Sequence, residues 1–132
     1  MKMKVYWVYK ILPAFVFFTE RFIPKKYQVA VTRFFICVFV RPNHIHQKCF
    51  IEHELTHVKQ TYRTLFLFPF LYLIPYFRFM FEAEAYARQA ICFGKKEYVH
   101  WFAQELIKHY NLNISYKKAY NKILNYYNRF RR

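Results

Sequence analysis

The sequence predicts an α+β fold in which short antiparallel strands come first and helices follow. Residues 27–40 (YQVAVTRFFICVFV) are rich in Val, Ile, Phe and Tyr, as strands are. From residue 46 onward, apolar residues recur with the period of an α-helix. Strands followed by helices are typical of α+β domains, and a chain of 132 residues is expected to form a single domain over residues 1–132.

The first part of the chain holds the expected strands. One strand is expected near residues 4–9, and residues 27–40 are expected to form one bent strand or a pair. The start of the chain is basic and apolar like a signal peptide, but Lys10 and Pro13 interrupt it and no small-residue cleavage site follows. The apolar stretches 29–40 and 65–77 are shorter than the roughly 20 residues that a spanning helix needs. Both are therefore expected to be buried elements of a soluble protein or of one that lies on a membrane surface.

The pattern of the second part of the chain predicts a series of helices. The only glycine, Gly94, is well placed to cap one of these helices. The rarity of glycine in the chain predicts long elements joined by polar or proline turns. It also argues against a glycine-rich phosphate loop, and so against nucleotide binding of that kind. The expected helices are 46–63, a short one near Pro69 and Pro75, 78–93, 95–110, and a basic helix at about 114–130.

The segment His53-Glu54-Leu55-Thr56-His57 is an HExxH motif on the first of these helices. Residues four apart project from one helix face, so His53 and His57 can bind one zinc ion through their imidazole nitrogens. Glu54 is rotated by about 100° around the helix, beside the metal rather than on it. There its carboxylate can take a proton from zinc-bound water and later pass it to a leaving amine.

A catalytic zinc site needs a third protein ligand, and the segment FEAEAYAR (81–88) offers Glu82 and Glu84. The two residues lie about 200° apart on a helix, so only one of them can face the metal. Glu84 is placed to pair with Arg88 on a solvent face, whereas the small neighbours of Glu82 allow close helix packing. Glu82 is therefore expected to be the ligand, with Glu84 as the alternative.

The segments HELTHVKQ and EAEAYARQ resemble the small gluzincins, zincin-type metallopeptidases with an HExxH helix and a downstream glutamate ligand. Compact, often phage-encoded peptidase-like proteins have a similar layout, and the resemblance covers roughly residues 27–92. It implies a zincin-like minimal domain, Zn²⁺ as cofactor, a peptide or protein as substrate, and a substrate-binding edge strand around residues 34–40. Where that family has an acidic or amide residue that supports a metal-bound histidine, this chain has Tyr86.

Other residues leave alternatives open. Cys49, one turn before His53, is a less favourable ligand, and the loop histidines His44 and His46 are expected to be solvated. The three cysteines have no paired spacing, so we expect no disulfide framework. We therefore expect the protein to be cytoplasmic, and peripheral to a membrane if it contacts one.

The net charge of +15, with no Asp in the chain, favours an anionic partner such as nucleic acid or a membrane surface. The basic, tyrosine-rich C-terminal helix can contact phosphates and bases, or can simply pack with its basic side chains in solvent. The alternative to a peptidase is thus a zinc-containing binding protein, catalytically weak or inactive, that associates with such a partner.

Overall fold

The structure is a computed structural model that describes residues 1–23, 25, 28–33, 35–42, 44 and 46–132. The fold is α+β, with a four-stranded mixed sheet and five helices in the described residues. The chain divides into two compact units, Met1–Phe68 and Pro69–Arg132. Each unit has its own apolar core and is described by itself.

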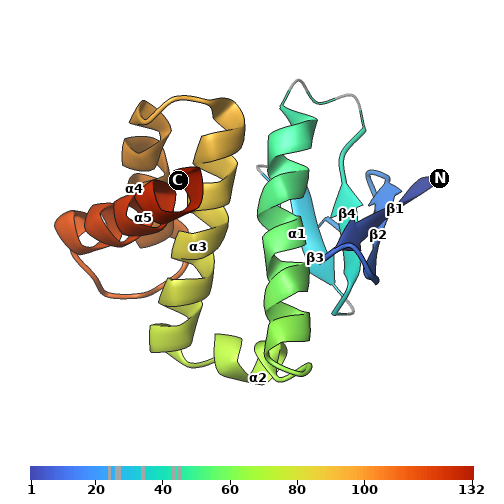
Figure 1. Ribbon diagram of the computed structural model, residues 1–132, viewed down its shortest axis with the longest axis horizontal. Helices are drawn as coiled ribbons and strands as arrows, with labels where there is room; N and C mark the ends of the chain where they lie inside the picture. Colours follow the sequence, from blue (N-terminus) through green and yellow to red (C-terminus); the bar gives the residue numbers. More distant parts are fainter. Residues whose placement is uncertain (24, 26–27, 34, 43, 45) are drawn as a thin grey trace. The chain divides into compact units, whose positions relative to one another are not determined.

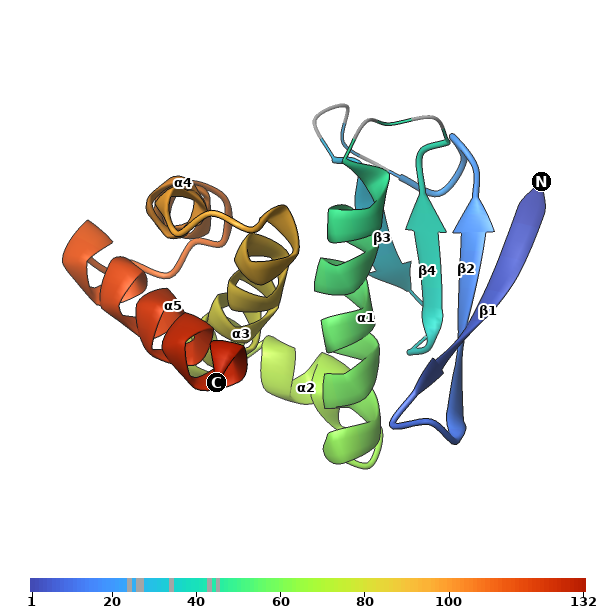
Figure 2. The same cartoon turned by 45° about the horizontal axis from the view of Figure 1, so that its top comes forward.

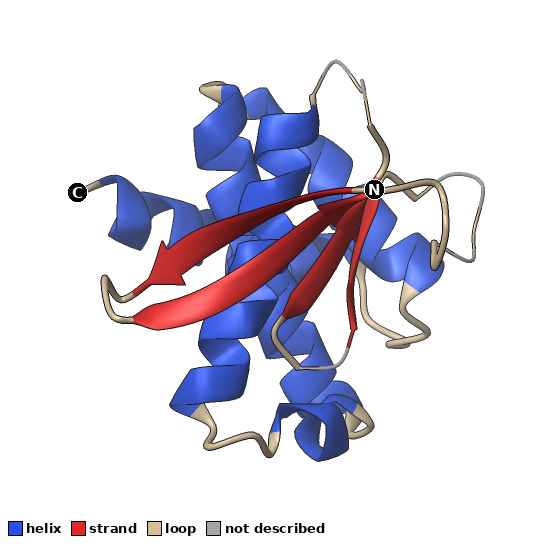
Figure 3. Cartoon of the chain, turned by 90° about the vertical axis from the view of Figure 1, so that its right-hand side faces the viewer, coloured by secondary structure: helices blue, strands red, loops and turns tan. Residues whose placement is uncertain are grey.

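The first unit contains the sheet. Its strands are β1 (Lys2–Val8), β2 (Leu12–Phe18), β3 (Ala30–Arg33) and β4 (Cys37–Val40), in the order β1-β2-β4-β3 (Figure 3). The β1–β2 and β3–β4 pairs are antiparallel, whereas β2 and β4 are parallel. The expectation of antiparallel strands is therefore wrong for one pair, because a connection too long for a hairpin joins β2 to β3 and lets β4 run alongside β2.

Strand β2 was not predicted from the sequence, because Pro13 interrupts its apolar run. Proline is unfavourable inside a sheet since it has no N–H to donate. The register shows why it is tolerated here: β2 pairs with β4 only from Phe15 onward, so Pro13 lies opposite Trp7 of β1 alone. The expected pair of strands within 27–40 is confirmed as β3 and β4, although residues 27 and 34 lie outside the described part.

Helix α1 (Gln47–Arg63) covers one face of this sheet (Figure 1). Ile51, Leu55 and Val58 are buried at helical spacing and pack against the sheet. The matching sheet residues are small or β-branched and form the core on that side: Val8, Ala14, Val16, Ala30, Val38 and Val40. The opposite face of α1 carries the HExxH histidines, so the apolar contacts with the sheet fix the direction in which these side chains project.

The second unit consists of helices α3 (Pro75–Phe93), α4 (Glu97–His109) and α5 (Tyr116–Arg131), which pack together as Figure 2 shows. The short helix α2 (Phe68–Tyr72) precedes them. Helix α3 begins at Pro75, three residues earlier than expected, because proline is well suited to the first turn of a helix. It ends as predicted at Gly94, whose φ of 80° lies in the left-handed region.

The core of the second unit is built from small residues on α3 and larger ones on α4 and α5. Ala83, Ala87 and Ala90 are fully buried, and their size lets the neighbouring helices approach closely. Val99, Phe102, Leu106, Ile123 and Tyr127 fill the space between the helices. Among the described helices, none is long and apolar enough to cross a membrane.

Candidate metal centre

The two motif histidines lie on one face of α1, one helical turn apart. Their ring centroids are 5.0 Å apart, and each residue is 6% exposed. The helical period of the segment explains this placement, because i and i+4 side chains share a face. Two buried imidazoles at this separation can supply two nitrogen ligands to one zinc ion.

Gln60 orients the second histidine of the motif. Its Oε1 lies 2.9 Å from Nδ1 of His57, and the Gln60 side chain is fully buried. An amide oxygen can only accept a hydrogen bond, so His57 donates from Nδ1 and carries its lone pair on Nε2. This is the tautomer and the kind of support that a metal-binding histidine usually has. Gln60 was not predicted as a site residue, although its position three residues after His57 on a helix was a usable signal.

Glu82 is buried in the second unit, where the hydroxyl of Tyr72 contacts it. It is 2% exposed, and the hydroxyl of Tyr72 donates a hydrogen bond of 2.6 Å to its Oε1. Burial raises the pKa of Tyr110 well above its usual value, and the negative charge of Glu82 and the neighbouring Tyr86 and Tyr72 raise it further. Tyr110 therefore remains a neutral hydroxyl group close to this carboxylate, and no local pattern predicts this role.

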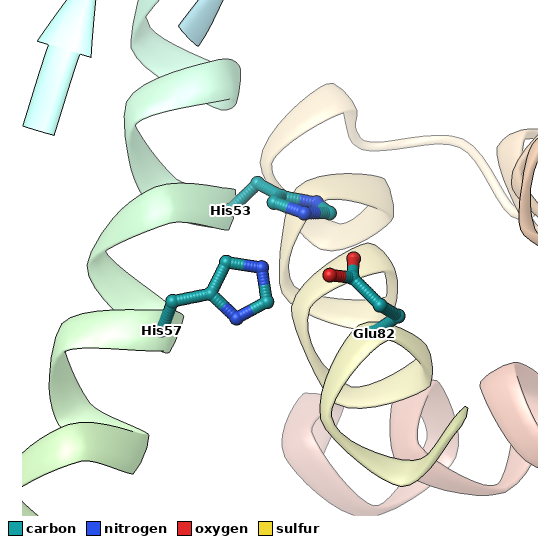
Figure 4. Close-up of side chains that lie close together, drawn as sticks. All are labelled: His53, His57 and Glu82. Carbon is teal, nitrogen blue, oxygen red and sulfur yellow. The ribbon is translucent and has the colours of Figure 1, made fainter. Parts of the chain in front are cut away.

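The structure brings three of the predicted site residues together. Ligand atoms of His53, His57 and Glu82 all lie within 4.8 Å of one another (Figure 4). All three residues are buried, and buried ionisable groups are stable when they are paired or coordinate a metal. The three residues are thus positioned to bind a metal ion.

Glu54, the predicted proton carrier, is held by the sheet rather than by the ligands. Thr32 of β3 donates a hydrogen bond of 2.5 Å from its hydroxyl to Oε2 of Glu54. Glu54 is half-buried, one residue after His53 on α1. This contact fixes the carboxylate on the side of α1 that faces β3. It could not be predicted from the sequence, because the two residues are 22 positions apart.

The remaining candidates are not part of the three-residue cluster. Glu84 is buried, at 8% exposure, and so the prediction that it lies on a solvent face is wrong. Its partner in that prediction, Arg88, instead lies with its guanidinium 3.7 Å from the ring centroid of Phe130. Cys49 is disulfide-bonded, so the expectation of no disulfide is wrong for this residue, and the bond removes the thiolate that a ligand role requires.

Tyr86 and the loop histidines make local contacts. The Tyr86 hydroxyl lies 3.1 Å from that of Tyr110, and its ring stacks on Phe102 with a centroid distance of 4.9 Å. His44 accepts a hydrogen bond from the backbone N–H of His46 at 3.2 Å, near the surface of the first unit.

Comparison with known proteins gives no further assignment. No protein-family model matches the chain, and neither the curated proteins nor the solved structures contain a significant match to it.

Proposed function

We propose that this chain is a zinc-dependent metallopeptidase with a zincin-like fold, related to the small gluzincins. The observation that carries the proposal is the convergence of buried His53, His57 and Glu82, with Glu54 next to the first of them on α1. Two imidazoles, one carboxylate and one open position are the ligand set of many catalytic zinc sites. The motif that predicts this chemistry and the cluster of side chains agree on the same residues.

Zinc fits the ligands better than the other common divalent ions. Magnesium and calcium prefer oxygen ligands, whereas two of the three ligands in this cluster are imidazole nitrogens. His57 already has the tautomer that offers Nε2, through its hydrogen bond to Gln60. When bound, zinc would supply Lewis acidity that polarises a carbonyl and acidifies water.

The residues of the chain perform the proton transfers. Glu54 would accept a proton from the attacking water and return it to the leaving amine. The hydroxyl of Thr32 holds the Glu54 carboxylate in one orientation, which lowers the entropic cost of reaching the reactive geometry. Tyr72 does the same for the Glu82 carboxylate.

Strand β3 is the structural element best suited to bind an extended peptide. The resemblance implied an edge strand at about residues 34–40, but β4 lies inside the sheet, between β2 and β3. The two end strands of the sheet are β1 and β3, and it is β3 that contacts Glu54 of α1, through Thr32. A peptide that adds to β3 by main-chain pairing would run alongside the proton carrier, which favours a peptide or protein substrate.

The proposal is tested with Glu54→Gln and a matched control, Glu52→Gln, which makes the same change two residues earlier on α1. Zinc content is measured by atomic absorption, and cleavage is measured on a mixture of peptides by mass spectrometry. We expect both variants to bind one zinc ion, and Glu54→Gln to lose at least a hundredfold in activity, since general base catalysis contributes about 10²–10⁴-fold. Glu52→Gln should retain the activity of the unmodified chain.

Two results would contradict the proposal in different ways. If the unmodified chain binds zinc but cleaves no peptide, the alternative of a zinc-containing binding protein is favoured. If neither the unmodified chain nor a His53→Ala variant binds zinc, the metal assignment itself is wrong.

A further inference from the structure

The second unit contains an open pocket that the proposed peptidase site does not use. It lies between the first half of α3 and the first half of α5, and its volume is about 500 Å³. Lys117, Lys118 and Lys122 of α5 line one side, and Tyr76 and Phe79 of α3 line the other. A volume of this size is within the usual range for small-ligand sites and is large enough for a nucleotide.

The residues of α5 that line the pocket give it a positive charge. Helix α5 contains no acidic residue, and no acidic residue lines the pocket. Lys117 and Lys118 lie in the first turn of α5, where the helix dipole is positive and disfavours cations. An anion in the pocket would relieve both the mutual repulsion of the lysines and their repulsion by the helix end.

The α3 side of the pocket offers an aromatic surface. Tyr76 is 64% exposed although it is a large aromatic residue, whereas Phe79, three residues later on the same helix, is buried. Nζ of Lys118 lies 5.7 Å from the ring centroid of Phe79, so a cation and an aromatic ring meet within the pocket. Exposed aromatic rings beside lysines are typical of sites that stack bases and contact phosphates.

The exposed face of α5 is unsuited to insertion into a membrane. Its apolar residues Ala119, Ile123 and Tyr127 are buried in the core of the unit. The exposed positions of the helix are polar or charged: Lys117, Lys118, Asn121, Asn125, Asn128, Arg129 and Arg131. A helix that lies in a membrane surface needs an exposed apolar face as well as basic residues, and α5 lacks one.

We propose that this pocket binds single-stranded nucleic acid, with the three lysines contacting phosphates and Tyr76 stacking on a base. The amides of Asn121 and Asn125, which also line the pocket, add neutral hydrogen-bond donors and acceptors for base edges. This function is independent of the zinc site, because none of the residues that line the pocket is a proposed ligand or the proposed proton carrier.

The test measures binding of a fluorescein-labelled oligothymidylate to the full chain by fluorescence anisotropy, over a range of salt concentrations. The pocket variant is Lys118→Gln/Lys122→Gln. The control is Lys96→Gln/Lys108→Gln, which removes the same charge from exposed lysines outside the pocket. Circular dichroism verifies that both variants remain folded.

We expect the pocket variant to bind at least tenfold more weakly than the control. We also expect the slope of log K against log salt to become shallower by about 1.4, since each phosphate contact to a single strand contributes about 0.7. Tyr76→Ala should weaken binding by about 5- to 150-fold without changing the slope, because base stacking involves no ion release.

Three outcomes would overturn the inference. The first is an equal loss of affinity in the pocket variant and the control, which would assign the binding to net charge alone. The second is binding to vesicles of anionic phospholipid, sensitive to the pocket variant, with no binding to the oligonucleotide. The third is unchanged affinity in Tyr76→Ala, which would exclude recognition of a base.

Discussion

The hydrogen bond between Gln60 and His57 allows a sharp test of the candidate metal centre. We consider Gln60→Met, which has a similar length but cannot accept a hydrogen bond from an imidazole N–H. Since Gln60 is fully buried, water cannot readily replace the lost amide oxygen. Nδ1 of His57 would then lose a bond of 2.9 Å, and the preferred tautomer would no longer be fixed.

The expected effect follows from the role of such supporting contacts at metal sites. Loss of one usually costs about 10- to 100-fold in metal affinity, which is about 1.4–2.7 kcal/mol. The metal-free protein should also lose about 1–3 kcal/mol of unfolding free energy, because a buried N–H is left without its acceptor. Gln60→Glu keeps the acceptor and adds a negative charge, so it should bind zinc at least as tightly as the unmodified chain.

The assay is zinc affinity by competition with a chelating dye, together with chemical unfolding of the metal-free protein. Gln89→Met is the matched control, since Gln89 is also buried, at 1% exposure, but lies outside the ligand cluster. It should lower stability without changing zinc affinity. The reasoning would be refuted if Gln60→Met bound zinc as tightly as the control, or if Gln60→Glu weakened binding as much as Gln60→Met.

Three further predictions concern the side chains of Tyr72, Thr32 and Cys37. Tyr72→Phe removes the hydrogen bond to Glu82 and should weaken zinc binding about tenfold in the dye competition assay; unchanged affinity would exclude a positioning role. Thr32→Val should leave zinc affinity unchanged but lower kcat about tenfold in the peptide assay, because Glu54 loses its orientation; equal kcat would show that the contact does not matter. Burial raises the pKa of the Cys37 thiol, so its alkylation by iodoacetamide should be slower than that of free cysteine at pH 8 and should accelerate at higher pH as thiolate forms. A rate equal to that of free cysteine at pH 8 would contradict the raised pKa.

Features of the chain that depend on neighbouring residues could be predicted without a structure. The helical period around His53 and His57 placed both imidazoles on one face of α1, because side chains four residues apart necessarily align on a helix. Gly94 ended α3 as predicted, since its left-handed φ is a property of one residue and its neighbours. The ranking of Glu82 above Glu84 also used only helix geometry and neighbour size. The cluster contains Glu82, although its role as a ligand stays a prediction.

Features that join distant segments depend on how the chain packs and could not be predicted from local patterns. The parallel pairing of β2 and β4 leaves β3 at the end of the sheet, and no periodicity within either strand specifies which neighbour it selects. The same holds for the contact of Thr32 with Glu54, where residues 22 positions apart meet because α1 packs on the sheet. Apolar patterns record which face of an element is buried, but the partner on that face depends on the packing of the whole unit.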